Sequence, residues 1–148
     1  MSALETATTS LVYCDRLVVT TRTRCQVVDI TPRVEEVIQH AGVQSGLLLV
    51  NTLHTTCSII VAATAPIEIV TLLEQLIPDD GPYLHNDVRW SDCERGNAAA
   101  HLRASLLGHG ATIAVARATL ALAASQSILL AEWDGPRSRA VDVRILGT

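Results

Sequence analysis

The chain lacks lysine and phenylalanine, and it is poor in aromatic residues altogether. All eleven basic residues among its 148 are arginines, aromatic residues make up 3% and hydrophobic residues make up 49%. The core must therefore be built from aliphatic side chains. The arginines are scattered, and no basic stripe alternates with aromatic residues, which argues against nucleic acid as the main partner.

Segments that direct a chain to a membrane are also missing. No apolar run reaches the ~20 residues that a membrane-spanning helix needs. Residues 1–10 have neither the basic start nor the apolar centre of a signal peptide. We therefore expect a cytoplasmic protein with no membrane partner. Cys14, Cys25, Cys57 and Cys93 have neither zinc-finger nor CxxC spacing, so each is expected to pack as a small apolar side chain.

Length and pattern predict one domain, 1–148, of the α+β class. Helices are predicted over 32–41, 66–76 and 96–107, and strands over 11–20, 24–30, 46–53, 57–63, 111–116, 126–133 and 139–146. Thr31 is expected to cap the first helix. The order ββ-α-ββ-α-α-βββ places strands at both ends of the chain with helices between them. The apolar surplus favours an oligomer.

The third predicted helix is the segment on which we expect a site. Ala99, Leu102 and Leu106 recur at helical spacing, so they are expected to face the core. Asn97 and His101 lie four residues apart and share a neighbouring face. A polar line beside a buried stripe can look into a cleft.

Three of the five histidines lie where elements end or on a helix flank. These are His54, His85 and His101, and three nitrogen donors can hold zinc or another divalent metal with one position open for a ligand. Acid and base roles are the alternative, because no HExxH pattern favours a metal. His40 is expected to be a polar residue at a helix end, and His109 is expected to be solvated in a glycine turn.

Other polar residues near strand ends fit a phosphate or an anionic substrate. Thr55 and Thr56 place two hydroxyls beside an imidazole, and Arg137 and Arg139 can form a fork on a phosphate. Glu132 has the parity of an inward-facing strand residue and can orient a histidine. The alternative is structural, with β-branched strand residues and a solvated charge pair.

Four groups of these residues stand in a recognisable order: Gly46-Leu47-Leu48 leading into His54-Thr55-Thr56, then Tyr83-Leu84-His85, then Asn97-x-x-x-His101-Leu102 with Ser105-Leu106-Leu107-Gly108, and last Gln126 with Glu132-Trp133-Asp134-Gly135-Pro136-Arg137-x-Arg139. In this series the chain resembles the YjbQ family, small proteins associated with secondary thiamine-phosphate synthase activity. The resemblance spans nearly the whole chain.

The resemblance implies a mixed sheet in a single α+β domain, a homotrimer, and a pocket near a subunit boundary where three histidines meet a metal or a phosphate. The implied reaction joins hydroxymethylpyrimidine diphosphate to a thiazole phosphate and releases pyrophosphate. Its implied catalytic residues are His101, His54 and Glu132, and its implied metal ligands are His54, His85 and His101. Its implied substrate-binding or phosphate-binding residues are Thr55, Thr56, Asn97, Gln126, Arg137 and Arg139.

The chain departs from the family pattern at three places. Ala62-Ala63 stands where the family has Asn-Glu, Leu72 stands where an Asp is usual, and Ala123-Ala124-Ser125-Gln126 replaces Gly-Thr-Trp-Gln. Two carboxylates and an aromatic residue are therefore absent, although carboxylates of the long polar loop could take their place. A non-catalytic trimer that binds a small phosphorylated ligand is the alternative function.

Overall fold

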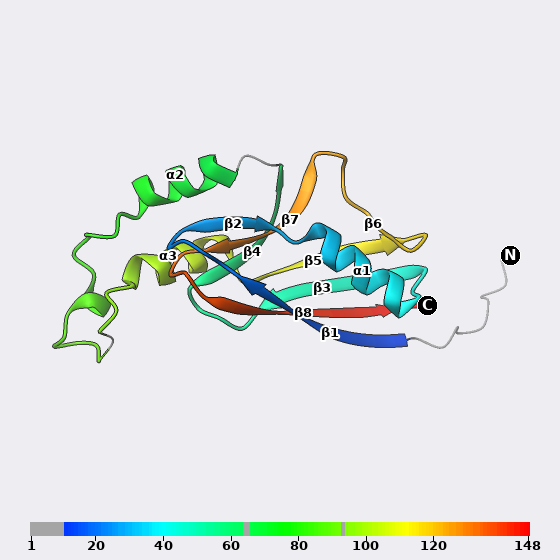
Figure 1. Cartoon of the computed structure of the whole chain (residues 1–148), viewed down its shortest axis with the longest axis horizontal. Helices are drawn as coiled ribbons and strands as arrows, with labels where there is room; N and C mark the ends of the chain where they lie inside the picture. Colours follow the sequence, from blue (N-terminus) through cyan, green and yellow to red (C-terminus); the bar gives the residue numbers. More distant parts are fainter. Residues whose placement is uncertain (1–10, 64–65, 93) are drawn as a thin grey trace, which may run out of the picture.

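Within residues 11–63, 66–92 and 94–148, which the computed structural model describes, eight strands form two sheets and helices cover them (Figure 1). The strands are β1 Leu11–Thr20, β2 Gln26–Asp29, β3 Ser45–Thr52, β4 Cys57–Ala63, β5 Gly110–Ala116, β6 Thr119–Leu120, β7 Gln126–Glu132 and β8 Ser138–Gly147. The helices are α1 Thr31–Ala41, α2 Pro66–Leu76, the short 3-10 helix η1 Leu84–Asn86 and α3 Ala98–Leu107. The α+β class is confirmed.

Every strand pairing between described residues is antiparallel, where one mixed sheet was expected. The five-stranded sheet has the order β1-β8-β3-β5-β6, and the three-stranded sheet has the order β2-β7-β4. The difference follows from the connections. A parallel pair needs a crossover that returns the chain to the same end of the sheet, and here each strand instead runs opposite to the neighbour it pairs with.

The three-stranded sheet forms the middle layer of the molecule. On one side, its Ile59, Ile128 and Leu130 pack against α1 and the inner face of the five-stranded sheet. On the other side, Ala131 packs with residues of α2 and α3 around the fully buried Trp133. The core is aliphatic apart from this tryptophan.

Helix α1 begins without the side-chain cap expected from Thr31. Ile30 holds the N-cap position, and the Thr31 hydroxyl instead accepts a hydrogen bond from the Ile128 backbone N–H at 2.8 Å. The Asp29 carboxylate accepts the Thr31 backbone N–H at 2.8 Å. The threonine therefore ties the helix to β7. The helix ends at Gly42, whose φ of 67° favours glycine.

Helix α3 buries Ala99 as predicted, but the rest of its buried face consists of small residues and an arginine in place of Leu102 and Leu106. Its buried residues are Ala98, Ala99, Ala100, Arg103 and Ala104, whereas Leu102 is 45% exposed and Leu106 is 59% exposed. The alanines allow the helix backbone to lie close to β4, where the Ser58 hydroxyl reaches the Ala104 carbonyl. The guanidinium of Arg103 is fully buried and donates to the Ile77 carbonyl.

The outer face of the five-stranded sheet is open in the chain described here. Val12, Leu146, Leu47 and Ala114 are neighbours across four strands, and all four are exposed. The apolar run in β3 was expected to be buried throughout, but it alternates because only one face of this sheet is covered.

The cysteines follow only in part the expectation that each packs as a small apolar side chain. Cys57 is buried and Cys25 half-buried, but Cys14 is exposed on the open sheet face, and Cys93 lies outside the described residues.

None of the described helices is long and apolar enough to span a bilayer.

Candidate functional site

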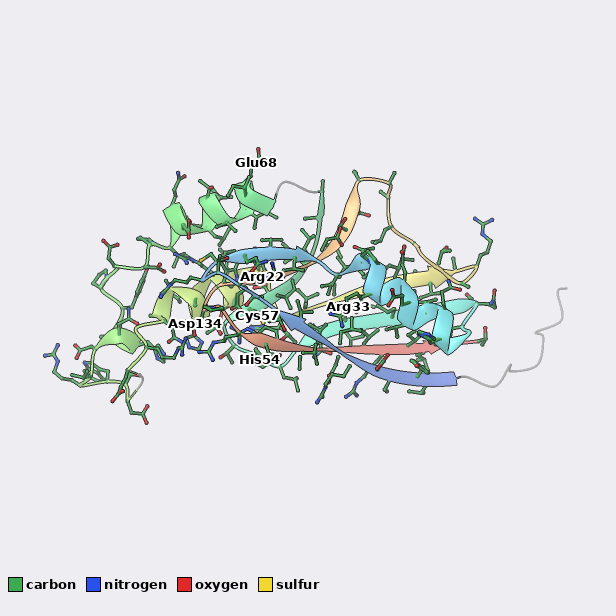
Figure 2. All side chains as sticks on the ribbon, in the orientation of Figure 1. Arg22, Arg33, His54, Cys57, Glu68 and Asp134 are labelled. Atoms are coloured by element: carbon green, nitrogen blue, oxygen red, sulfur yellow. The ribbon has the colours of Figure 1, made fainter. Side chains whose placement is uncertain are left out.

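Most of the predicted polar residues meet where β3, β7 and β8 and the start of α3 come together. A pocket of about 310 Å³ lies there, and its lining residues are Leu53, His54, Thr55, Thr56, Asn97, His101, Asp134, Arg137 and Arg139. Figure 2 shows the labelled His54 and Asp134 near one end of the sheets, close to α3, with Arg33 further along the molecule. We refer to this cavity as the polar pocket.

A buried ion pair forms the floor of the polar pocket. The Arg139 guanidinium donates to both oxygens of Glu132, with 2.6 Å from Nε to Oε2, and its Nη2 also donates to the Thr56 hydroxyl at 2.8 Å. Glu132 is fully buried and also accepts the backbone N–H groups of Trp133 and Asp134. Burial lowers the pKa of Arg139, but the hydrogen bonds and charge of Glu132 outweigh it and raise the pKa overall.

Asp134 forms a second charged cluster at the rim of the pocket. Its carboxylate accepts hydrogen bonds from Asn97 at 3.0 Å, from Arg95 at 3.2 Å and from Arg137 at 2.9 Å. Burial alone raises the pKa of Asp134, but these three donors lower it overall because they favour the ionised carboxylate. The adjoining Gly135 lies against the Thr23 carbonyl, where any larger residue would clash.

The two histidines of the polar pocket both have a lowered pKa, which favours the neutral form. His54 Nε2 accepts a hydrogen bond from the Ala140 backbone N–H at 3.0 Å. Burial lowers the pKa of His54 below its ordinary value of 6.5, and the charges of Arg139 and Arg137 lower it further. Burial and the neighbouring His85 also lower the pKa of His101, despite its hydrogen bond with the Thr55 backbone.

His85 reaches the site from η1, beside a second cavity. Its Nε2 lies 3.2 Å from Asn97 Oδ1, and its ring contacts the His101 ring edge-on, with centroids 4.8 Å apart. This cavity, the apolar pocket, measures about 480 Å³. Its lining residues are Pro82, Tyr83, Leu84, His85, Ala98, His101 and Leu102. The three histidines therefore do not share one pocket, since only His101 borders both.

The charges around the polar pocket favour an anion. The guanidinium groups of Arg95, Arg137 and Arg139 face the carboxylates of Glu132 and Asp134, which leaves one positive charge in excess. A positive, partly enclosed cavity raises the local concentration of anionic ligands.

The donors present do not fit the expected three-histidine metal centre. Zinc needs each ligand nitrogen at about 2.0–2.1 Å from one point. The Nε2 of His54 does not have a free lone pair for such a bond, because it accepts a hydrogen bond from a backbone N–H. Among the described residues, no three His, Cys, Asp or Glu side chains lie where they could hold an ion together. The described residues of one chain therefore do not form the expected three-histidine centre.

Several expected site residues take positions that the sequence pattern did not predict. Gln126 lies outside the pocket at the opposite end of β7 from Glu132, and its side chain accepts the Ala123 backbone N–H instead. Glu132 faces inward as expected, but its partner is Arg139 rather than a histidine. Asp134 was not among the expected site residues, although an acidic residue beside Gly-Pro-Arg is the signal that could have marked it.

The departures from the family pattern lie at the Gln126 end of β7. Ala63 is paired directly with Gln126 across β4 and β7, and both are exposed. Leu72 on α2 is 60% exposed. None of the replaced residues lines the polar pocket, so they are separated within one chain from the retained residues that do.

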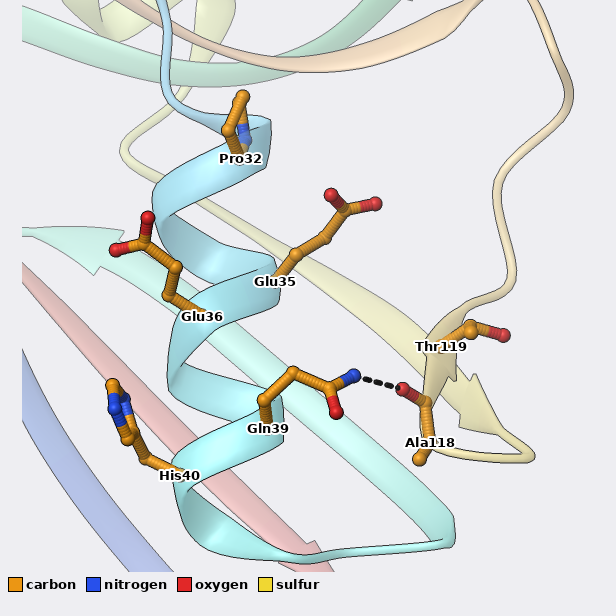
Figure 3. Close-up of a pocket in the computed structure, with 7 residues that line it drawn as sticks. All are labelled: Pro32, Glu35, Glu36, Gln39, His40, Ala118 and Thr119. Atoms are coloured by element: carbon orange, nitrogen blue, oxygen red, sulfur yellow. Dashed lines mark hydrogen bonds between the residues drawn. The ribbon is translucent and has the colours of Figure 1, made fainter.

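A further cavity, of about 470 Å³, lies between α1 and the β5–β6 turn (Figure 3). Its wall holds Glu35, Glu36 and His40, and Gln39 donates to the Ala118 carbonyl at 3.0 Å.

The other outlying histidine, His109, was expected to be solvated. It is instead half-buried, and its Nε2 is buried without a hydrogen-bond partner in the described part of the chain.

Comparison with known proteins places this architecture in one family. The family model described as "UPF0047 protein YjbQ-like" matches residues 15–148. A UPF0047 protein from Methanothermobacter thermautotrophicus is 35% identical over 139 residues, covering 92% of this chain and 93% of its own. The UPF0047 protein YugU from Bacillus subtilis is 30% identical, with 88% and 97% covered.

Solved structures agree with the sequence comparison. A YbjQ-like protein of unknown function from Sulfolobus solfataricus has a TM-score of 0.87 at 31% identity, covering 95% of this chain and all of the other. A hypothetical protein from Aeropyrum pernix has a TM-score of 0.84 at 35% identity, covering 92% and 99%. The chain belongs to the YjbQ-like UPF0047 family.

Proposed function

We propose that the polar pocket binds and converts a small phosphorylated substrate. The observation that carries this proposal is the excess positive charge of a pocket lined by two arginines, two threonine hydroxyls and two neutral histidines. Arg137 is the guanidinium on which the proposal depends most, because it is only half-buried and its carboxylate partner is shared with two other donors. The apolar pocket, on the other side of His101, suits a flat apolar portion of the same substrate.

The reaction that we propose for this site is that of a secondary thiamine-phosphate synthase. The thiazole nitrogen displaces pyrophosphate from the methylene carbon of hydroxymethylpyrimidine diphosphate, so a C–N bond forms as a C–O bond breaks. Both bonding electrons leave with pyrophosphate. Positive charge and N–H donors at the polar pocket stabilise the charge that develops on this leaving group.

We also propose that the active form is a homotrimer. The open face of the five-stranded sheet and the exposed residues of α2, including Leu72 and Leu76, present apolar surface that a second copy would cover. Light scattering after size-exclusion chromatography tests this. A Leu146→Glu variant is expected to shift the mass from that of a trimer to that of one chain, and a monomeric wild type would contradict the proposal.

The test of the proposed reaction uses the full chain with both substrates and follows thiamine phosphate and pyrophosphate. Titration calorimetry with inorganic pyrophosphate measures the anion site separately. His101→Ala is expected to abolish turnover. Arg137→Gln is expected to weaken pyrophosphate binding about tenfold, the equivalent of one charge-assisted hydrogen bond. Arg117→Gln, which removes an exposed arginine from the β5–β6 turn, is the charge-matched control.

The alternative function is ligand binding without catalysis. It is favoured by the alanines at 62–63 and by Leu72, which stand where the family pattern has polar residues. Tight pyrophosphate binding with no turnover would support this alternative. Pyrophosphate binding that is equally weak in the wild type and in Arg137→Gln would contradict both functions.

A further inference from the structure

Asn97 joins two side chains of the site, and Asp134 fixes its orientation. An ionised carboxylate can only accept hydrogen bonds, so the group that lies 3.0 Å from Asp134 Oδ2 must be the Asn97 amide nitrogen. The Asn97 carbonyl oxygen then faces His85 Nε2 at 3.2 Å. A carbonyl oxygen only accepts, so Nε2 of His85 must carry the proton. In the neutral form of this ring, Nδ1 is then the proton-accepting nitrogen.

The opposite assignment holds for His54. Its Nε2 lies 3.0 Å from the backbone nitrogen of Ala140, which can only donate. Nε2 therefore carries the lone pair, and the proton of the neutral ring lies on Nδ1. Burial and the nearby guanidinium groups, which lower the pKa of His54, keep the ring in this neutral state.

We infer that the fold holds His54 and His85 in opposite tautomers, with Asn97 and Asp134 as the positioning residues for His85. His54 then offers an Nδ1–H donor in the polar pocket. His85 offers an Nδ1 acceptor beside the apolar pocket. This division of roles distinguishes the two histidines, which residue type alone cannot do.

The consequence for the ligand rests on the proposed function. An N–H donor at His54 suits a phosphate oxygen, and an acceptor at His85 suits an amino or hydroxyl group on the apolar portion of the substrate. A metal at His54 Nε2 would have to displace the Ala140 N–H.

Long-range ¹H–¹⁵N correlation spectra of the ¹⁵N-labelled full-length protein, without ligand at pH 7.5, test the assignment directly. His54 is expected to show a protonated Nδ1 and an unprotonated Nε2, and His85 is expected to show the reverse. A wild-type spectrum with the same tautomer on both rings would overturn the inference.

Two variants test the positioning residues. Asn97→Leu removes the acceptor, and Asp134→Asn allows the Asn97 amide to turn over. Each is expected to change His85 from one tautomer to a mixture, while the His54 signals stay unchanged and report that the fold survives. Asn51→Leu, the same substitution in β3, is the matched control. An unchanged His85 tautomer in both variants would contradict the positioning role.

Inorganic pyrophosphate, added to the same samples, separates this inference from the proposed function. Opposite tautomers together with a ligand-dependent shift at His54 Nδ1 support both. Opposite tautomers with no response of either ring to pyrophosphate support the tautomer assignment and count against the anion site.

Discussion

The two ends of β7 differ sharply in burial and in polarity. At its carboxyl end, Glu132 lies opposite Cys57 of β4 and is enclosed with Arg139 in a buried charged network. At its amino end, Gln126 lies opposite Ala63, and both are exposed. The same two strands therefore carry a dense polar network at one end and a sparse, solvated surface at the other.

This contrast indicates where the chain bears the free-energy cost of burying charged groups. Removing a guanidinium and a carboxylate from water costs several kcal/mol for each ion, and mutual attraction compensates only when the hydrogen-bond geometry is good. The Glu132 and Arg139 pair meets that condition, since its oxygens and nitrogens have further partners in Thr21 and Thr56. A network of this kind beside a pocket is typical of a functional site.

The largest expected effect comes from breaking the buried pair. Glu132→Gln removes the charge that compensates Arg139, so the free energy of unfolding is expected to fall by about 3–5 kcal/mol. Urea unfolding followed by circular dichroism measures this change. Glu68→Gln, the same substitution on the exposed first turn of α2, is expected to cost less than about 1 kcal/mol. Equal losses in the two variants would contradict the special cost assigned to the buried pair.

A smaller effect is expected at Asp134. Asp134→Asn weakens a nearly buried acceptor of three donors, so it is expected to cost on the order of 1–3 kcal/mol at neutral pH. Because the folded pKa of Asp134 lies below its ordinary value of 3.8, this stabilisation is present above that value. It is lost as the pH falls through the folded pKa. Unfolding of wild type and variant from pH 7 to pH 3 should show the difference closing only at the acid end.

The histidines of the polar pocket give a weaker pH dependence at milder pH. Both His54 and His101 have a lowered folded pKa, so the unfolded chain binds more protons just below pH 6.5. Stability is therefore expected to be complete above pH 6.5 and to decrease as the pH falls through the folded pKa values. His54→Gln should reduce this slope between pH 7.5 and 5.5, and exposed His40→Gln should leave it intact. A slope equal in all three proteins would exclude His54 as its source.

The elements could be predicted from the sequence because each has a local cause. β1, β4 and α2 begin and end at the predicted residues, where periodicity and Pro66 define them. The buried face of α3 could not be predicted in this way. The leucine spacing placed Leu102 and Leu106 on the buried face, but the alanines lie close to β4 and their face is the one that is buried. Periodicity tells which residues share a face, but not which face the neighbouring sheet will cover.

The candidate site could likewise be predicted from the sequence only in part. Thr55, Thr56 and His101 were placed by strand and helix ends, which are local features. The partners of Glu132 and Asp134 were not, because Arg139 and Arg95 reach them through tertiary packing that no spacing encodes. A parity argument gave the inward direction of Glu132 correctly and left its partner open.

The smallest effect on stability is expected at the sparse end of β7. Ala63→Glu and Leu72→Asp restore the carboxylates of the family pattern on exposed surface, so each should change the free energy of unfolding by less than about 0.5 kcal/mol. Because both positions lie outside the polar pocket of the same chain, pyrophosphate affinity should also stay unchanged. Synthase activity that appears only in the double variant would indicate an enzyme that has lost part of its site. Since Ala63 and the polar pocket lie at opposite ends of β4, such a gain would also require that a neighbouring copy bring the two ends together, and it should vanish in the Leu146→Glu background.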